Sequence, residues 1–254
     1  MLDAILASAR ARLPRLLVEA DALSAAAARA PASRDFAAPL RGSHLGVIAE
    51  MKRRSPSAGP IAPDLVPEDL AADYRRGGAS AMSVLTEQEF FGGSLADLEA
   101  VRRRVETPVL RKDFIIHEVQ IDESRAAGAD AVLLIVSALE ESDLAALVSR
   151  TADGGMTAMV EAHDADEVRR AIDAGASVVG VNNRDLKTFG VDLGTAERLR
   201  TLIPDEVVAV AESGIRGPED ALRMAAAGFD AILVGQAAVQ SGDPAAFIAS
   251  LGSP

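Results

Sequence analysis

A glycine-centred pattern recurs four times in the chain and constrains the fold more than any other feature. Gly78, Gly128, Gly175 and Gly228 each follow a helix-like segment and precede a short apolar run, in steps of 50, 47 and 53 residues. A glycine in this position commonly ends a helix, and a fully buried parallel strand has a nearly continuous apolar sequence. A step near 50 residues therefore indicates two strand–helix units per repeat.

Four further apolar runs lie midway between the repeats, so the sequence predicts eight strands that alternate with helices. The runs are residues 47–51, 108–110, 157–160 and 207–211. This alternation predicts a (β/α)8 TIM barrel, which commonly fills a chain of 254 residues. A doubly wound open sheet is the alternative, but the Gly-rich loop that usually follows its first strand is absent from the sequence.

We expect residues 1–254 to form one barrel domain, of which residues 1–44 are an N-terminal helical extension. Apolar side chains recur at helical intervals between Leu2 and Leu23. Pro14 is expected to kink or divide this helix. An extension of this length before the first strand is expected to cap the bottom of the barrel.

The formal net charge of −12 disfavours nucleic acid as a partner. The cations Lys52, Arg53 and Arg54 suggest a small anionic ligand, and no cysteine is present to form a disulfide or a thiolate metal site. No apolar run approaches the roughly 20 residues of a membrane helix, and the N-terminus lacks the apolar core of a signal peptide. We therefore expect a cytoplasmic protein without a membrane partner and, from its net charge, a monomer.

Polar side chains follow most of the predicted strands, where the working residues of a TIM barrel lie. His44, His117 and His163 are isolated in the sequence and are expected to be structural or exposed. Lysines and carboxylates therefore predict acid–base chemistry that uses no metal and no cofactor. A lysine crowded by other cations is expected to have a lowered pKa. The polar side chains at the strand ends include Glu50, Lys52, Arg111, Lys112, Asp113, Glu161, Asn182, Arg184, Glu212 and Ser213, which are the pool of candidate catalytic residues.

The turns after the seventh and eighth predicted strands favour a phosphate site. Each is small, contains glycine and precedes a helix, whose first N–H groups bind anions well. The candidate residues are Gly214, Gly235 and Gln236, with Ser55 able to reach across to them. Phe90, Phe91 and Phe114 cluster after two other strands and are expected to bind an aromatic ring. The proline-rich loop 53–67 is a candidate lid that orders over bound substrate.

Six ordered motifs between about residues 40 and 244 resemble the indole-3-glycerol-phosphate synthase family of tryptophan biosynthesis. They are IAEMKRRSPS from residue 48, SVLTE from 83, LRKDF from 110, VEAH from 160, GVNNRDL from 180 and AESGI from 211. This family converts 1-(2-carboxyphenylamino)-1-deoxyribulose 5-phosphate (CdRP) into indole-3-glycerol phosphate, and releases CO₂ and water. No single motif is specific to this family, whereas six motifs in this order are.

The resemblance implies roles among the candidate residues. Lys112 protonates the ketone oxygen as the aromatic carbon attacks, and Lys52 holds the anthranilate carboxylate and is a second candidate acid. Glu161 assists proton transfer, and Glu50 orients the lysines. The division of acid and base roles stays open. The residues implied to position the substrate are Asn182, Arg184, Glu212 and Ser213. The residues implied to bind the phosphate are Ser55, Gly214, Gly235 and Gln236. The ring pocket is lined by Phe91, Phe114, Leu133 and Leu186.

Two residues depart from the family's pattern. Arg54 stands where a smaller residue is expected, which predicts an extra positive charge beside the phosphate, and Gln236 stands where serine or glutamate is usual. The alternatives are another phosphate-binding TIM-barrel enzyme, such as phosphoribosylanthranilate isomerase, and a non-catalytic barrel. The isomerase is expected to use a cysteine base, which this chain lacks. The intact set of Lys52, Lys112 and Glu161 argues against a non-catalytic barrel.

Overall fold

Eight parallel strands close into a barrel in the computed structural model, which describes residues 1–185 and 188–252. In order around the barrel they are β1 (Gly46–Met51), β10 (Ala231–Val234), β9 (Val208–Glu212), β8 (Val178–Asn182), β7 (Thr157–Ala162), β6 (Ala131–Ile135), β5 (Val109–Lys112) and β4 (Ala81–Leu85). Strand β4 pairs with β1 and completes the circle. The predicted strands and the predicted (β/α)8 barrel are confirmed.

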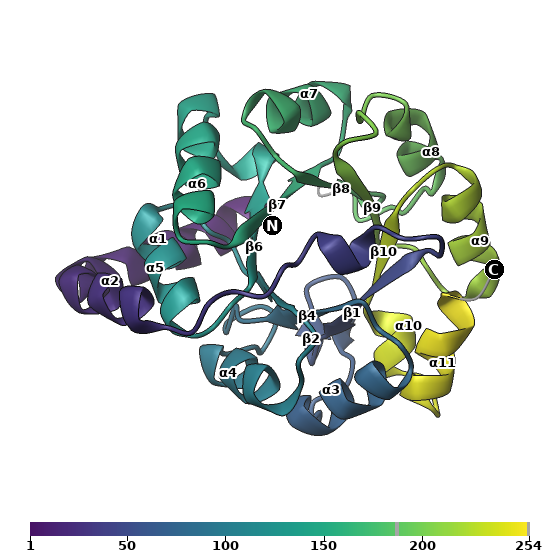
Figure 1. Cartoon of the computed structure of the whole chain (residues 1–254), viewed down its shortest axis with the longest axis horizontal. Helices are drawn as coiled ribbons and strands as arrows, with labels where there is room; N and C mark the ends of the chain where they lie inside the picture. Colours follow the sequence, from purple (N-terminus) through teal and green to yellow (C-terminus); the bar gives the residue numbers. More distant parts are fainter. Residues whose placement is uncertain (186–187, 253–254) are drawn as a thin grey trace.

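Helices form the outer ring of the barrel (Figure 1). They are α3 (Pro67–Arg76), α4 (Leu95–Arg104), α5 (Glu118–Ala126), α6 (Glu141–Asp153), α7 (Ala165–Asp173), α8 (Gly194–Arg200), α9 (Pro218–Ala226), α10 (Gln236–Val239) and α11 (Pro244–Leu251). The repeat glycines end α3, α5, α7 and α9 with φ between 85° and 90°. Such a positive φ favours glycine, which explains the spacing that revealed the fold.

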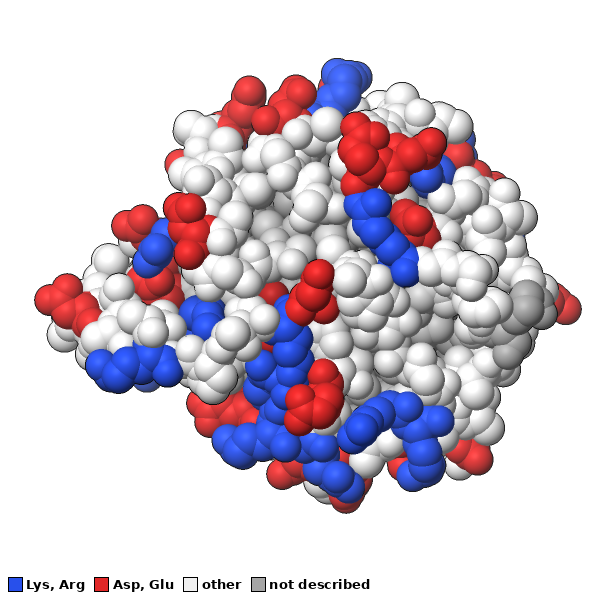
Figure 2. All heavy atoms as spheres, viewed as in Figure 1, with Lys and Arg blue, Asp and Glu red and all other residues white. Residues whose placement is uncertain are grey.

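The N-terminal end of the barrel is closed by the segment between α2 and β1, which crosses the centre of the barrel in Figure 1. This segment contains a 3₁₀ helix, Ala38–Leu40. Phe36 and Leu40 are fully buried in a cluster with Ile48 and Leu110, which belong to the barrel strands. The middle of this face carries few charges in Figure 2. The prediction that the extension caps the bottom of the barrel is confirmed for this segment.

The extension begins with two helices, α1 (Leu2–Val18) and α2 (Ala20–Arg29), which pack against α5. The helix divides at Glu19 (φ −94°, ψ 4°), not at Pro14, which lies within α1. Pro14 and Arg10 are both exposed, so water can satisfy the carbonyl that proline leaves without a donor. None of the helices in the described ranges combines the length and apolarity that crossing a membrane requires.

Candidate active site

A cavity of about 570 Å³ opens where the barrel strands end. Most of the predicted site residues that the structure describes line it: Glu50, Lys52, Ser55, Phe91, Lys112, Phe114, Leu133, Glu161, Asn182, Arg184, Glu212, Ser213, Gly214, Gly235 and Gln236. Leu186 lies outside the described residues. Side chains from far apart in the chain thus meet in one place because parallel strands end together.

Lys112, the last residue of β5, lies at the centre of the charged part of the cavity. Its Nζ atom is 2.9 Å from an oxygen of Glu161 on β7 and 3.3 Å from an oxygen of Glu212 on β9. Asn182, at the end of β8, donates to the other oxygen of Glu161 at 3.0 Å. Strand alternation sends the neighbouring Arg111 to the opposite face, where it contacts α5. The inward lysine is therefore surrounded by carboxylates.

This arrangement reverses the expected effect on the pKa of the lysine. Burial alone lowers the pKa of Lys112, but the negative charges of Glu161, Glu212 and Glu50 outweigh burial and raise it above its ordinary value. The other cations of the first motif do not crowd this lysine: Arg53 pairs with Asp97 on α4. The prediction of a lowered lysine pKa is wrong here, because the sequence did not show that three carboxylates converge on Lys112.

The two carboxyl groups beside Lys112 differ in protonation. Burial raises the pKa of each, and the charge of Lys112 lowers it. For Glu161 the charge of Lys112 prevails with the help of His163 and Asn182, so its pKa lies below the ordinary value. For Glu212 burial prevails, and Glu161 adds a second negative charge, so the pKa rises to about 7. The Oε1 atom of Glu212 is buried without a hydrogen-bond partner among the described residues.

A second lysine–carboxylate pair lies at the end of β1. The Nζ atom of Lys52 is 2.5 Å from Oε1 of Glu50, which is buried. Gly235, after β10, leaves room for this carboxylate, since a Cβ atom there would lie 2.6 Å from Oε1 of Glu50. The pairing of Glu50 with Lys52 agrees with the orienting role that the resemblance implies, and its negative charge reaches Lys112 as well.

The turns proposed for phosphate lie side by side on one wall of the cavity. Ser213 and Gly214 follow β9 with φ of 64° and 88°, and Gln236 begins α10 directly after Gly235. Ser55 faces them from a small hairpin of β2 (Arg54–Ser55) and β3 (Gly59–Pro60). Arg216, which the sequence analysis did not single out, also lines this wall.

Arg54 does not contribute to this wall. Its side chain is exposed, packs beside Gly92 and is not among the residues that line the cavity. Arg54 therefore does not supply the extra positive charge that was expected at this part of the cavity, whereas Arg216 is a cation that lines it. Arg54 lies three residues beyond the end of β1 at Met51, and sequence alone does not assign the direction of a side chain in such a loop.

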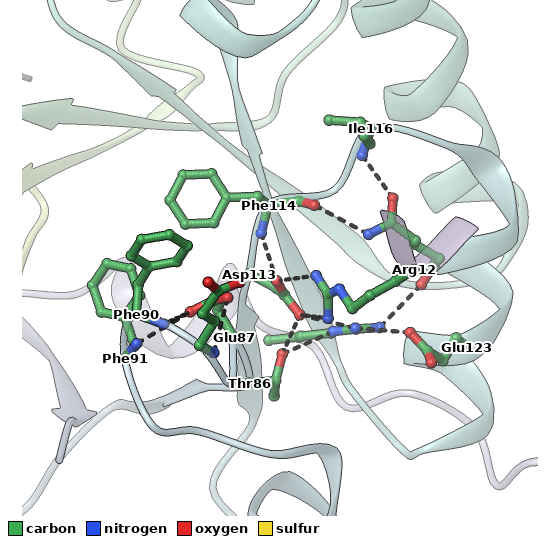
Figure 3. Close-up of polar contacts among 12 residues, drawn as sticks. Arg12, Thr86, Glu87, Phe90, Phe91, Asp113, Phe114, Ile116 and Glu123 are labelled. Carbon is green, nitrogen blue, oxygen red and sulfur yellow. Dashed lines mark hydrogen bonds and ion pairs between the residues drawn. The ribbon is translucent and has the colours of Figure 1, made fainter. Parts of the chain in front are cut away.

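The apolar lining of the cavity includes the three residues predicted for the ring pocket that the structure describes, Phe91, Phe114 and Leu133. The two aromatic rings have centroids 6.2 Å apart at an angle of 33°, and Figure 3 shows them side by side. Buried Glu87 accepts hydrogen bonds from the backbone N–H groups of Phe90 at 2.7 Å and Phe91 at 3.1 Å, which fixes the turn that carries Phe91. Phe90 is not among the lining residues, so the predicted aromatic cluster is smaller by one ring.

Comparison with known proteins shows the family of the chain. A family model described as "Indole-3-glycerol phosphate synthase" matches residues 2–251. The chain belongs to the indole-3-glycerol phosphate synthase family. A protein of that name from Streptomyces griseus is 52% identical over 253 residues, which cover 99% of this chain and 94% of the relative. Another from Parafrankia sp. is 56% identical over 223 residues, 88% of this chain and 83% of the relative.

More distant structures share only the fold with this member of the synthase family. The structure of 3-hexulose-6-phosphate synthase has a TM-score of 0.64 at 18% identity, and the match covers 82% of this chain and 98% of that one. A thiamine phosphate pyrophosphorylase from Pyrococcus furiosus has a TM-score of 0.62 at 16% identity, with 82% and 93% covered. The family resemblance inferred from the six motifs is confirmed, and the isomerase and the non-catalytic barrel are not favoured.

The first helix reaches the site of this synthase-family barrel, which the sequence analysis missed. Met1, Leu2 and Ile5 line the cavity. Arg12 donates to both oxygens of Asp113, at 2.9 and 3.4 Å (Figure 3). A helical period predicts α1, but it carries no information about which loop the helix contacts.

Asp113 lies between the site residues Lys112 and Phe114 in the sequence and links several elements. It also accepts from Arg111 at 3.0 Å, from Thr86 at 2.7 Å and from the backbone N–H of Phe114 at 2.8 Å. Burial raises the pKa of Asp113, but the charges of Arg111 and Arg12 outweigh it and hold the pKa well below the usual range. The carboxylate thus stays ionised and ties α1 to the end of β5.

His163 was expected to be structural or exposed, like the other two histidines, and the sequence analysis did not connect it with the site. His44 is exposed and His117 caps α5, as predicted. His163, in contrast, contacts Glu161 and Glu167, with ring nitrogens 3.3 and 2.9 Å from their oxygens. The signal was present in the spacing: Glu161 and His163 are two apart on a strand, and His163 and Glu167 are four apart at the start of a helix.

Proposed function

We propose that this chain catalyses the closure of CdRP to indole-3-glycerol phosphate, with loss of CO₂ and water. The observation that carries the proposal is the position of Lys112 between Glu161 and Glu212, at the centre of a cavity with aromatic walls at one side and phosphate-binding turns at another. In a chain of this family, the arrangement matches a substrate with a carboxylated ring at one end and a phosphate at the other.

Lys112 begins the reaction as the proton donor. Its raised pKa keeps the ammonium group protonated at neutral pH. As the ring carbon attacks the ketone, negative charge develops on the ketone oxygen, and a positioned ammonium group both stabilises that charge and neutralises it by proton transfer. Buried surroundings strengthen this stabilisation because water does not screen it.

Lys52 binds the carboxylate that is later lost as CO₂. A carboxylate bound too tightly in the ground state would raise the barrier to its departure. Glu50 moderates the attraction, because its oxygen at 2.5 Å already shares the charge of Lys52. Once CO₂ has left, the aromatic system is restored, and the hydroxyl group formed at the former ketone can depart with a proton from a lysine.

Glu161 is the base that removes the proton during dehydration. Its lowered pKa leaves it ionised, so it can accept a proton at neutral pH. Glu212, with a pKa of about 7 and an unpaired buried oxygen, can carry a proton to or from Lys112 between steps. Asn182 holds Glu161 at 3.0 Å, and Arg184 shares the wall with it.

The phosphate binds at the turns after β9 and β10. The first N–H groups of α10 lack partners within the helix, and Ser55 and Arg216 offer a hydroxyl and a positive charge from the surrounding wall. Phe91, Phe114 and Leu133 enclose the aromatic ring. We further propose a monomeric, cytoplasmic protein that needs neither nucleic acid nor a membrane. The net charge of −12 supports this, and light scattering in solution tests the oligomeric state.

Fluorescence tests the reaction directly, because the chain contains no tryptophan and one tyrosine. CdRP is added to the purified protein and to Lys112→Ala, with the exposed Arg10→Ala as a control, and indole emission is followed. We expect signal from the wild type and control and little from Lys112→Ala. Indole emission from all three proteins would indicate that Lys52, and not Lys112, is the essential proton donor. A folded wild type that binds CdRP without producing indole would overturn the proposed function.

A further inference from the structure

His163 lies between two carboxylates, one in the site and one outside it. The residue follows β7 two positions after Glu161, so both side chains lie on the same face. Its Nε2 atom is 3.3 Å from Oε1 of Glu161, and its Nδ1 atom is 2.9 Å from Oε2 of Glu167 in the first turn of α7. The ring is largely buried, with 15% of the side chain exposed.

The two carboxylates favour the protonated form of the ring. Nδ1 makes a hydrogen bond with Glu167 at 2.9 Å, whereas Nε2 lies 3.3 Å from Glu161 without a hydrogen bond among the described residues. Two negative charges at these distances stabilise the imidazolium cation relative to the neutral ring. Burial alone lowers the pKa of His163, but Glu161 and Glu167 outweigh it and raise the pKa to about 10.

The surrounding charges place this cation within the catalytic network. The charged groups in contact with the ring are Glu161 on its own strand and Glu167 on α7. Beyond Glu161 lies Lys112 on β5, which contacts the other oxygen, and beyond the lysine lies Glu212 on β9. Glu161 therefore accepts hydrogen bonds from Lys112 at one oxygen and from Asn182 at the other, and Nε2 of His163 lies 3.3 Å from the oxygen that Asn182 contacts.

The local backbone does not need the imidazole ring. The N-terminus of α7 is capped by Asp164, whose oxygen accepts from the backbone N–H of Glu167 at 2.9 Å. The carboxylate of Glu167 in turn accepts from the backbone N–H of His163 at 2.8 Å. These two bonds fix the strand-to-helix turn without the ring, so the contact from Nε2 to Glu161 serves the site.

We propose that His163 and Glu167 form a positioning pair that keeps the Glu161 carboxylate ionised and aimed at Lys112. The inference rests on the proposed function, in which Glu161 is the base. Glu167 compensates the charge of His163, so the ring can remain a cation in a buried place. When Lys112 gives up its proton, His163 continues to hold Glu161 in position.

The pH dependence of kcat tests the pair, with His163→Gln as the main variant. Glutamine can still donate a hydrogen bond but carries no charge. Loss of an adjacent cation raises the pKa of a carboxyl group by about one unit or more. We therefore expect the acidic limb of the kcat profile to move up by about one pH unit, which is about a tenfold loss below that limb, with little change in KM. Glu167→Gln is expected to move the acidic limb of the kcat profile in the same direction by a smaller amount.

His117→Gln is the matched control, since His117 caps α5 and is not among the described residues that line the cavity. Its profile should coincide with that of the wild type. A folded His163→Gln protein with the wild-type acidic limb would overturn the proposal, because a merely structural role changes stability and not this limb.

A second readout is independent of activity. The chain has three histidines, so ¹⁵N resonances of the rings can be assigned with the His163→Gln and His117→Gln variants. At pH 8 the ring of His163 should have both nitrogens protonated, and a neutral ring would overturn the proposal. This measurement distinguishes the proposed role of His163 from the proposed function of the protein. An inactive wild type with a charged His163 would contradict the proposed function alone.

Discussion

Gly180 on β8 lies directly against the carboxylate of Glu212 on β9, so that a Cβ atom on the glycine would lie 2.2 Å from Oε1 of the glutamate. The two strands are paired, and their side chains meet inside the barrel mouth. The absence of a side chain at position 180 therefore decides where Glu212 lies. The same oxygen is the buried one without a hydrogen-bond partner among the described residues.

Gly180→Ala is expected to lower activity while leaving the fold intact. The nearest atoms to the new methyl group are ends of flexible side chains, Oε1 of Glu212 and Cε of Met159 at 2.8 Å, and both can move. A misplacement of about 1 Å in an active site can cost about a hundredfold in rate, so we expect kcat/KM to fall at least tenfold. Thermal unfolding should change little. Gly242→Ala, where a Cβ meets nothing within 4 Å, is the control. Unchanged kcat/KM would refute the positioning of Glu212 by Gly180.

Arg12→Ala tests the attachment of the first helix to the site. The substitution removes the two hydrogen bonds to buried Asp113 and leaves that carboxylate to Arg111 and Thr86. We expect a loss of about 1–3 kcal/mol in the free energy of unfolding, measured by urea denaturation. KM should also rise, because the start of α1 lines the cavity. The control is Arg10→Ala on the exposed side of the same helix, and equal stability of the two variants would show that the ion pair is dispensable.

The hairpin of β2 and β3 is expected to become more ordered over a bound ligand. One end of its loop is already held, since Arg53 contacts Asp97 at 2.5 Å and donates to the carbonyl of Leu65 at 3.2 Å. Ser55 and its neighbours at the tip line the cavity, where phosphate would hold them. Addition of indole-3-glycerol phosphate should slow amide hydrogen exchange in residues 54–60 relative to residues 97–104 of α4. Equal exchange with and without the ligand would exclude a lid.

The contribution of His163 to stability should depend on pH in a defined direction. Its pKa is raised in the folded protein to about 10, against an ordinary value of 6.5. A group of this kind stabilises the fold fully below its unfolded pKa and loses the effect as pH rises through the folded one. The difference in unfolding free energy between wild type and His163→Gln should therefore be largest near pH 6 and shrink toward pH 10. Urea titrations across this range measure it, and a difference that grew with pH would contradict the assignment.

The barrel was predictable because its signals are local. A glycine that ends a helix, an apolar run and a polar residue just beyond it lie within a dozen positions, and each repeats around the barrel. The parallel arrangement then brings the polar residues together without further information. Lys112, Glu161 and Glu212 were found by this rule alone, although 49 and 51 residues separate them in the chain.

The remaining features depend on the directions in which side chains point, and no local sequence pattern specifies these directions. The pKa of Lys112 is raised because three strands aim carboxylates at it. The contact of Arg12 with Asp113 spans 101 residues and joins a surface helix to a loop. Arg54 lies away from the cavity and Arg216 lines it because each side chain leaves its loop in a direction that the rest of the fold sets. Leu186 lies outside the described residues, so its predicted place in the ring pocket stays a prediction.

Phe36 and Leu40 fill the floor of the barrel, and the catalytic cavity opens at the other end, where the strands end. In the proposed reaction CdRP enters, and CO₂, water and indole-3-glycerol phosphate leave, past α1 and the β2–β3 hairpin, which both line this cavity. The turns proposed for phosphate line the same cavity, so the long product blocks the exit while it remains bound. CO₂ and water therefore have to diffuse past the bound product or leave after it. The passage of all three products through the same opening becomes a candidate limit on turnover.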